Sequence, residues 1–208
     1  MFSPPEALRS CLPIPLWCSM PTYAWTVCDD GKLYKTDGTT ISTTVDIKAS
    51  EPWLTASNLL MVAPGPTGSI VVLDGNGVEK SRRWVMDRVE WAIGGASGRV
   101  YCFDGKGEGR VVTVATNGRI TVGERFNAPA VVDPLNAVIS GSSLYIACEN
   151  RDYLATFSLT DPDVPVFVSA VRYEALCIIP ARDAPVAVLI APRRAAHWER
   201  GTAARLIM

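Results

Sequence analysis

The stretch SIVVLDGNGVEKS, from Ser69 to Ser81, carries the pattern that decides the fold. An apolar run ends at Leu73, an Asp-Gly pair follows at Asp74, and a second strand-like run comes after it. Asp-Gly between two such runs is a strong signal for a β-hairpin, because the turn needs positive φ values that Gly adopts freely and Asp tolerates. The stretch therefore predicts two antiparallel strands joined by a tight turn.

The same arrangement occurs twice more along the chain. KLYKTDGTTIS runs from Lys32 to Ser42, and RVYCFDGKGEGRVVTV runs from Arg99 to Val114. Their Asp-Gly pairs begin at Asp37 and Asp104, so the three pairs are spaced about 30 to 40 residues apart, near the length of one four-stranded sheet. Each is preceded by another strand and a turn of small residues, which indicates a repeated sheet-forming unit.

Weaker copies of this unit follow. A fourth, without Asp-Gly, lies between Ala137 and Asp163, and a fainter fifth lies between Ala175 and Met208. Val, Ile, Thr and Tyr are common in all of them, as is typical of strands. Helix content should be low, with two short segments of helical spacing at Pro5 to Cys11 and Val85 to Ile93.

The phrases GKLYKTDG, GSIVVLDGNG and GRVYCFDGKG resemble the inner-strand signature of quinoprotein-type and WD-like β-propeller repeats. The shared pattern is a Gly, two or three residues, an aromatic residue or Val, an apolar residue and Asp-Gly. The resemblance covers most of the chain after Tyr23 and implies an all-β fold, a small β-propeller of about five blades. Residues 1–22, which are rich in Pro, would then form an arm or a closing segment. A β-sandwich or an open array of hairpins is the alternative.

Composition predicts a single globular domain over residues 1–208. Hydrophobic residues make up 48% of the chain and charged residues 20%, and no shift in composition marks a second domain. Twenty Lys and Arg against 21 Asp and Glu leave no basic surplus, so nucleic acid is not expected as a partner. No run approaches the roughly twenty apolar residues of a membrane-spanning helix, and no membrane association is expected.

The six cysteines predict buried free thiols in a protein made in the cytoplasm. They are scattered without a C-x-x-C pair, and most lie in apolar runs. A disulfide framework or a metal site is the alternative. The N-terminal residues contain Glu6 and several prolines and do not have the pattern of a secretory signal.

No catalytic residue, metal site or cofactor is predicted. The chain has one histidine, His197, with no nucleophile motif beside it, and it has no phosphate-binding glycine loop. Asp74, Asn76 and Glu79 superficially resemble a calcium loop, but their spacing and number do not match one. A role for Asp74 in stabilising its own turn is the better interpretation.

Tryptophan and arginine provide the candidate site residues, because both are enriched at protein interfaces. Most of the six tryptophans are expected in the core, with some exposed as interface anchors or as platforms for sugar rings. The interface candidates are two tryptophans near repeat boundaries and a basic C-terminal cluster: Trp53, Trp84, Arg193, Arg194, Trp198, Arg200 and Arg205.

These features predict a non-catalytic subunit of a larger protein assembly, with other protein subunits as partners. A bacteriophage virion, in its tail or decoration layer, is the expected setting. Two alternatives stay open. Three or more exposed tryptophans in equivalent positions would favour a carbohydrate-binding, lectin-like module. Two converging carboxylates would favour a glycoside hydrolase.

Overall fold

The computed structural model describes residues 24–36, 40–51, 53–148 and 153–172, together with the backbone of two later strands at Leu176–Ile179 and Ala187–Ile190. Strands dominate this part of the chain, and its only helical elements are two short 3-10 turns, η2 (Pro66–Gly68) and η3 (Ala96–Gly98). In the same residues, no helix has the length and apolarity needed to traverse a lipid bilayer.

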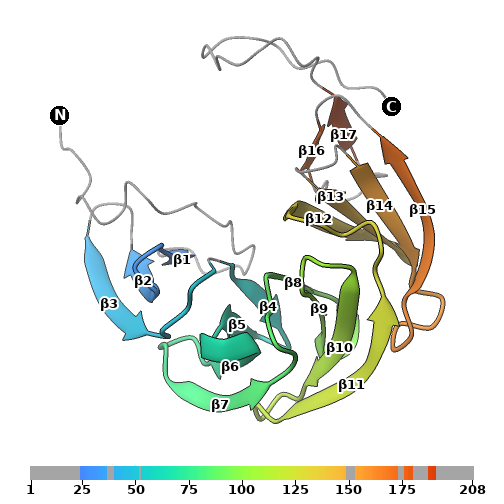
Figure 1. Ribbon diagram of the computed structural model, residues 1–208. Helices are drawn as coiled ribbons and strands as arrows, with labels where there is room; N and C mark the ends of the chain where they lie inside the picture. The colour runs from blue at the N-terminus through green and yellow to red at the C-terminus, as the bar shows by residue number, and fades with distance from the viewer. Residues whose placement is uncertain are drawn as a thin grey trace, which may run out of the picture. The chain divides into compact units, whose positions relative to one another are not determined.

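Five antiparallel sheets account for the described strands, and each is built from strands that follow one another along the chain (Figure 1). The first sheet has three strands, the next three have four each, and the fifth has two. In order they contain β1 (Ala24–Val27), β2 (Lys32–Thr36) and β3 (Ile41–Asp46); β4 (Thr55–Ser57), β5 (Leu60–Pro64), β6 (Ser69–Leu73) and β7 (Glu79–Trp84); β8 (Trp91–Gly94), β9 (Arg99–Phe103), β10 (Glu108–Val114) and β11 (Ile120–Asn127); β12 (Pro134–Ser140), β13 (Ser143–Cys148), β14 (Tyr153–Ser158) and β15 (Val166–Arg172); β16 (Leu176–Ile179) and β17 (Ala187–Ile190).

The short helix expected at Val85 to Ile93 is absent. These residues form an extended connection that leads into β8. Val85 and Val89 are buried in one cluster with Trp53. The interval of four therefore reflects contacts with a neighbouring sheet and not a helical face. The other expected helix, Pro5 to Cys11, lies outside the described residues.

Strand β6 is buried along its whole length because sheets cover both of its faces. Val71 and Leu73 pack with the first sheet, in a cluster that includes Trp25 and Leu33. The alternate residues Ile70 and Val72 pack with the third sheet, in a cluster that includes Val100 and Val112. A strand covered on both faces reads as a continuous apolar run, which is why SIVVL shows no alternation.

The hairpin after β6 is confirmed, but its turn differs from the two-residue Asp-Gly turn that the sequence predicts. The left-handed residue is Gly77, with φ of 80°, and not Gly75. The Gly77 N–H donates to the Asp74 carbonyl at 2.9 Å, and the Asp74 N–H donates to the Val78 carbonyl at 3.0 Å. This is a three-residue loop that ends in a glycine bulge.

The Asp-Gly pairs do not mark equivalent places in successive sheets. Asp74 follows the third strand of its sheet, whereas Asp104 follows β9, the second strand of the next sheet. The counterpart of the Asp74 turn lies instead after β10, where the Gly118 N–H donates to the Ala115 carbonyl at 2.8 Å and Gly118 has φ of 88°. The repeated phrase is therefore a property of single hairpins. Asp37 lies outside the described residues.

Polar contacts join the second and third sheets, one between their first strands and one from the turn after β4 to the end of β10. The Gly94 N–H donates to Thr55 Oγ1 at 2.6 Å, and Asn58 Nδ2 donates to the Val114 carbonyl at 2.5 Å. Gly94 lies so close to the second sheet that a Cβ there would stand 2.1 Å from the Ala56 carbonyl oxygen. A glycine is required at this point because the two backbones touch.

The chain divides into two compact units, one of residues 1–104 with 110–123 and one of residues 105–109 with 124–208. The two apolar clusters described above belong to the first unit. In the second unit, Val138 and Ala147 form a smaller buried cluster with Leu154 packed against it. Because repeated sheets contact mainly their neighbours, such grouping is expected of a repeat array, and the single domain over residues 1–208 stays a prediction.

A matched pair of glycine substitutions tests the close approach of backbones at the β5–β6 turn. Gly68 and Gly141 both have positive φ, but a Cβ on Gly68 would lie 1.7 Å from the Met86 carbonyl oxygen, whereas a Cβ on Gly141 would meet nothing within 4 Å. Gly141→Ala should cost roughly 1–2 kcal/mol of unfolding free energy from backbone strain alone. Gly68→Ala should cost about 1–3 kcal/mol more, measured by urea denaturation. Equal losses in the two variants would contradict the close packing.

Candidate interaction surfaces

Three sheets carry the same irregularity in their last strand. Ser42 in β3, Lys80 in β7 and Val168 in β15 are each an extra residue relative to the neighbouring strand. Such a β-bulge bends an edge strand and turns its side chains outward. All three residues are exposed, so the last strands offer comparable surfaces with different chemistry.

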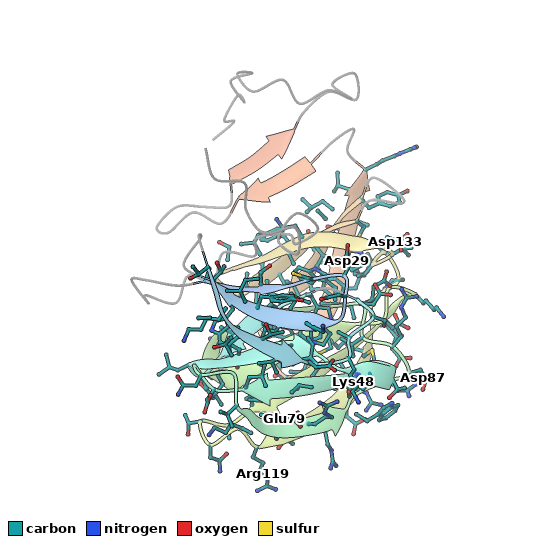
Figure 2. All side chains as sticks on the ribbon, turned by 90° about the vertical axis from the view of Figure 1, so that its left-hand side faces the viewer. Asp29, Lys48, Glu79, Asp87, Arg119 and Asp133 are labelled. Carbon is teal, nitrogen blue, oxygen red and sulfur yellow. The ribbon has the colours of Figure 1, made fainter. Side chains whose placement is uncertain are left out.

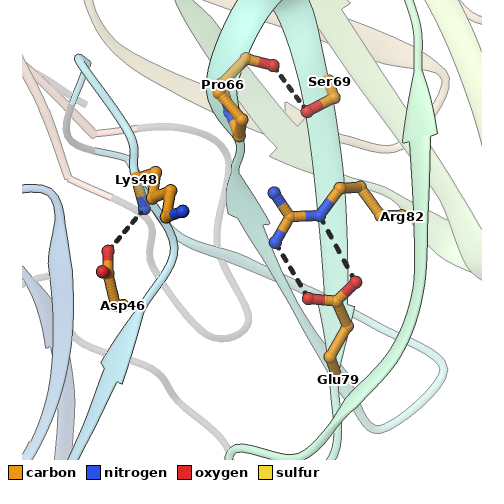
Figure 3. Close-up of polar contacts among 6 residues, drawn as sticks. All are labelled: Asp46, Lys48, Pro66, Ser69, Glu79 and Arg82. Carbon is orange, nitrogen blue, oxygen red and sulfur yellow. Dashed lines mark hydrogen bonds and ion pairs between the residues drawn. The ribbon is translucent and has the colours of Figure 1, made fainter.

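Most of the exposed residues of β7 are charged. Arg82 Nη2 lies 2.9 Å from Glu79 Oε2 and Arg82 Nε lies 3.3 Å from Glu79 Oε1, a two-point contact visible in Figure 3. The Arg82 hydrogen bonds hold the pKa of Glu79 below its usual range. The bulge residue Lys80 pairs with Asp74, with Nζ and Oδ2 3.0 Å apart. Most charged side chains of this strand therefore form ion pairs with other residues of the chain.

Trp84, at the end of β7, is an exposed aromatic residue on the same strand as these paired charges. Its side chain is 48% exposed, and the Arg110 guanidinium lies 5.8 Å from the ring centroid. Arg110 Nε is buried without a hydrogen-bond acceptor in the described part of the chain, so the ring face is its principal contact. Arg83 precedes Trp84 in β7, is exposed, and makes no ion pair within the described residues. Because successive side chains of a strand point to opposite faces, a partner would reach Arg83 and Trp84 together at the edge of β7. We refer to Arg83, Trp84 and Arg110 as the Trp84 surface.

A second exposed surface lies on β15 and is apolar. Val164, Val166, Val168 and Val171 are 54% to 61% exposed, and together we call them the valine row. By contrast, Phe167 packs edge-on against Phe157, with ring centroids 5.6 Å apart. The strand thus has one anchored face and one solvent-facing row of valines.

The sequence-predicted interface residues divide into three groups. Trp84 is exposed, as an interface residue must be. Trp53 is 1% exposed inside an apolar cluster, with Nε1 directed at the Val89 carbonyl 3.5 Å away, so its role is packing and it offers no surface. The basic C-terminal cluster lies outside the described residues: Arg193, Arg194, Trp198, Arg200 and Arg205.

Two features of these surfaces escaped sequence reasoning. Arg110 is remote from Trp84 in the chain and reaches it only because the second and third sheets are neighbours. The valine row lies after the fourth repeat copy, where the sequence VPVFVSAVR has no charge before Arg172. The contrast with the charged EKSRRW of β7 is visible in the sequence, but the equivalence of the two strands is not.

The described residues contain no group of three or more His, Cys, Asp or Glu that could hold a metal ion. At the β6–β7 turn, Asp74 Oδ1 accepts hydrogen bonds from the N–H groups of Asn76 at 2.9 Å and Val78 at 3.0 Å. The Val78 bond and the contact with Lys80 hold the pKa of Asp74 below its usual range. Asp74 therefore stabilises its own turn, as the sequence predicts.

The cysteines follow the free-thiol prediction only in part. Cys102 and Cys148 are free and buried, and burial raises the pKa of Cys102 to about 12. Thiols with raised pKa values are poor nucleophiles. Cys28 is disulfide-bonded, so the expectation of a free thiol is wrong for this residue. Cys11 and Cys18 lie outside the described residues, and for Cys177 only the backbone, in β16, is described.

No protein-family model matches the chain, and no curated protein sequence matches it. Solved structures do match. A functionally unknown protein from Desulfotomaculum acetoxidans superposes with a TM-score of 0.64 at 11% identity, over 90% of this chain and 66% of that one. BamB from Moraxella catarrhalis gives 0.51 at 17% identity, over 81% and 55%. Saccharomyces cerevisiae Sqt1 gives 0.58 at 12% identity, over 82% and 52%. Two further matches, both from Bacteroides, carry the name 6-phosphogluconolactonase at 12% identity.

At these identities the likeness shows the fold alone. BamB and Sqt1 are β-propellers, which confirms an all-β fold of the β-propeller type with about five sheets. The resemblance to propeller repeats is thus supported by the fold and by no sequence match. The chain spans about half to two thirds of the length of the structures named above.

Substitution of the two predicted interface tryptophans should distinguish a buried tryptophan that stabilises the fold from an exposed one that does not. Trp53→Ala removes a fully buried side chain and should lower the free energy of unfolding by about 3–5 kcal/mol. Trp84→Ala loses mainly the contact with Arg110 and should cost about 1 kcal/mol or less. Urea denaturation followed by circular dichroism measures both, and similar losses would contradict the assignment of Trp84 to the surface.

The Asp74 turn should make stability depend on pH in the acid range. Because the folded pKa is lowered, the contribution is complete above the unfolded value of about 3.9 and is lost as pH falls through the folded pKa. Asp74→Asn should melt at a lower temperature than the wild type at pH 7, with the difference narrowing below about pH 4. Asp87→Asn is the control, because Asp87 is an exposed carboxylate on the same unit (Figure 2). A difference that does not change with pH would contradict the role of the Asp74 charge.

Proposed function

We propose that this chain is a non-catalytic interaction subunit that binds another protein through the Trp84 surface. The observation that carries the proposal is the half-exposed Trp84 ring, with the Arg110 guanidinium over it, at the end of an edge strand in which Arg83 is also exposed. Tryptophan and arginine are the residues that contribute most to binding energy at protein interfaces.

The fixed position of the Trp84 side chain in the free protein supports this role. A tryptophan side chain that is already held against Arg110 loses little conformational freedom on binding. Its exposed part can then fill a pocket of a partner, while the ring face under Arg110 stays covered. The cation–π contact itself contributes about 0.5–1 kcal/mol at an exposed site.

Charge indicates the chemistry of the partner. The nearby Arg82 is neutralised by Glu79, whereas Arg83 has no such partner in the described residues. An aspartate or glutamate of the bound protein would pair with Arg83 and supply the charge-assisted hydrogen bond that the strand lacks. The partner surface is therefore expected to be an apolar pocket with a carboxylate at its rim.

The carbohydrate-binding alternative lacks its defining feature in the part of the chain that the structure describes. Trp84 is the only exposed tryptophan there, since Trp25 and Trp53 are buried and Trp91 is half-buried. A glycan platform of three equivalent tryptophans does not occur among these residues. The named lactonases are similar in fold at 12% identity, which supports no shared activity. Nothing in the names of the similar structures indicates a virion, so the proposal leaves the phage setting aside.

Binding with variant surfaces tests the proposal. The tagged full chain is used to isolate partners from its native cells, and each candidate partner is purified and titrated by calorimetry. Trp84→Ala and Arg83→Glu should each raise the dissociation constant about thirtyfold or more, the effect of removing a hot spot. Val78→Ala, at an exposed valine that precedes β7, should leave it unchanged.

Two results would overturn the proposal. One is that every purified partner binds the Trp84→Ala and Arg83→Glu variants as tightly as the wild type. The other is that the chain binds an isolated oligosaccharide and loses that binding in Trp84→Ala, which would establish the carbohydrate-binding alternative.

A further inference from the structure

We propose that β15 pairs antiparallel with β15 of a second copy of this chain, so that the protein forms a symmetric dimer through the valine row. The proposal concerns a different strand from the Trp84 surface and does not depend on it. It rests on the free edge of β15, on its apolar side chains and on the distribution of charge along it.

The free edge is the first observation. β15 is the last strand of the fourth sheet, and among the described residues no strand pairs with its outer side. An edge strand presents a row of backbone N–H and C=O groups that can pair with a further strand. In the same unit, the fifth sheet does not fill this place, because β16 lies beside β12 and β13 at the other side of the sheet.

Comparison with the other last strands shows what β15 lacks. Proteins protect edge strands with bulges and with charged side chains, lysine above all. The bulge residue is Lys80 in β7 and Ser42 in β3, but it is Val168 in β15. Val168 is 60% exposed. Of these three strands, only β15 has an exposed apolar residue at its bulge, so its edge is the one best suited to association.

Charge along the segment selects a second copy as the occupant. Asp161 and Asp163 precede the valine row, and Arg172 ends it. In an antiparallel pair, the acidic end of one copy lies beside the basic end of the other, at both ends of the interface. With a two-fold axis midway between Asp163 and Arg172, Val164 of each copy lies opposite Val171 of the other, and Val166 lies opposite Ser169. The apolar segments of the two copies then lie side by side. This is the self-complementary pattern that a two-fold dimer requires.

The anchored face of β15 makes the edge rigid enough to serve as a template. Phe167 packs on Phe157, which in turn packs on Phe126, with ring centroids 6.0 Å apart. The chain is also near neutrality, with 20 basic and 21 acidic residues, so mutual repulsion between copies is weak. One strand pairing is a small interface, and a dimer in the micromolar range is expected.

Sedimentation equilibrium of the full chain over about 1 to 100 µM tests the dimer. The wild type should associate to a dimer and no further. Val168→Lys, which places at the bulge the residue that β7 has there, should raise the dissociation constant at least tenfold. Val78→Lys is the matched control, because Val78 is 54% exposed on another sheet, and it should dimerise like the wild type. Near-ultraviolet circular dichroism checks that each variant is folded.

Charge reversal gives a second and independent measurement. Asp163→Arg alone and Arg172→Asp alone should each weaken the dimer, because each places like charges side by side. The doubly reversed variant should recover the wild-type dissociation constant, since the opposite charges meet again. Recovery of this kind is not expected if the single substitutions act by disturbing the fold.

Any of three outcomes would overturn the proposal: a wild type that remains monomeric throughout, open-ended association, or a Val168→Lys dimer as tight as that of the wild type. Trp84→Ala should leave the dimer unchanged. A failure of the dimer and a failure of the Trp84 surface are therefore distinguishable.

Discussion

The rest of the structure depends on the burial of single strands between two neighbouring sheets. In β6, Ile70 and Val72 pack on one side while Val71 and Leu73 pack on the other, so each sheet is covered only if its neighbours are present. A lone four-stranded sheet would leave both of these faces in water, at a cost of about 1.5–3 kcal/mol for each large apolar side chain. Stability is therefore shared between adjacent sheets, as it is in other repeat architectures.

Close contact between sheets constrains the turns as strongly as the strands. Gly94 is limited to glycine by the Ala56 carbonyl, and the left-handed Gly98 lies against Asn58 and Val114. The contacts of Gly94 with Ala56 and of Gly98 with Asn58 join the second sheet to the third. Asn58 also donates to the Val114 carbonyl, so a side chain satisfies a backbone group at the point where the ladder of the third sheet ends. Small residues between strands thus have two roles, since they form the turns and they allow the sheets to approach.

The sequence predicted the features that depend on residues close together in the chain, and it did not predict those that depend on contacts between sheets. The hairpin at Ser69 to Ser81 and the role of Asp74 in its turn were predictable, because strand pattern and turn chemistry lie within a dozen residues. The place of Asp104 within its sheet was not, since similar hairpins occupy different positions in successive sheets. The spacing of Val85 and Val89 suggested a helix because burial against Trp53 is invisible in one dimension. For the same reason, Trp53 and Trp84 looked equivalent as interface candidates although only Trp84 is exposed.

The same packing explains why the candidate surfaces lie on last strands. Interior strands such as β6 have both faces committed to neighbouring sheets, so substitutions there act on stability. A last strand has one side that no strand of its sheet occupies, and its exposed residues can vary while the fold is kept. In β7 this freedom supports paired charges around Trp84, and in β15 it supports the valine row. Two strands with the same bulge and the same place in their sheets can therefore have opposite chemistry, and the two proposed interfaces rest on that difference.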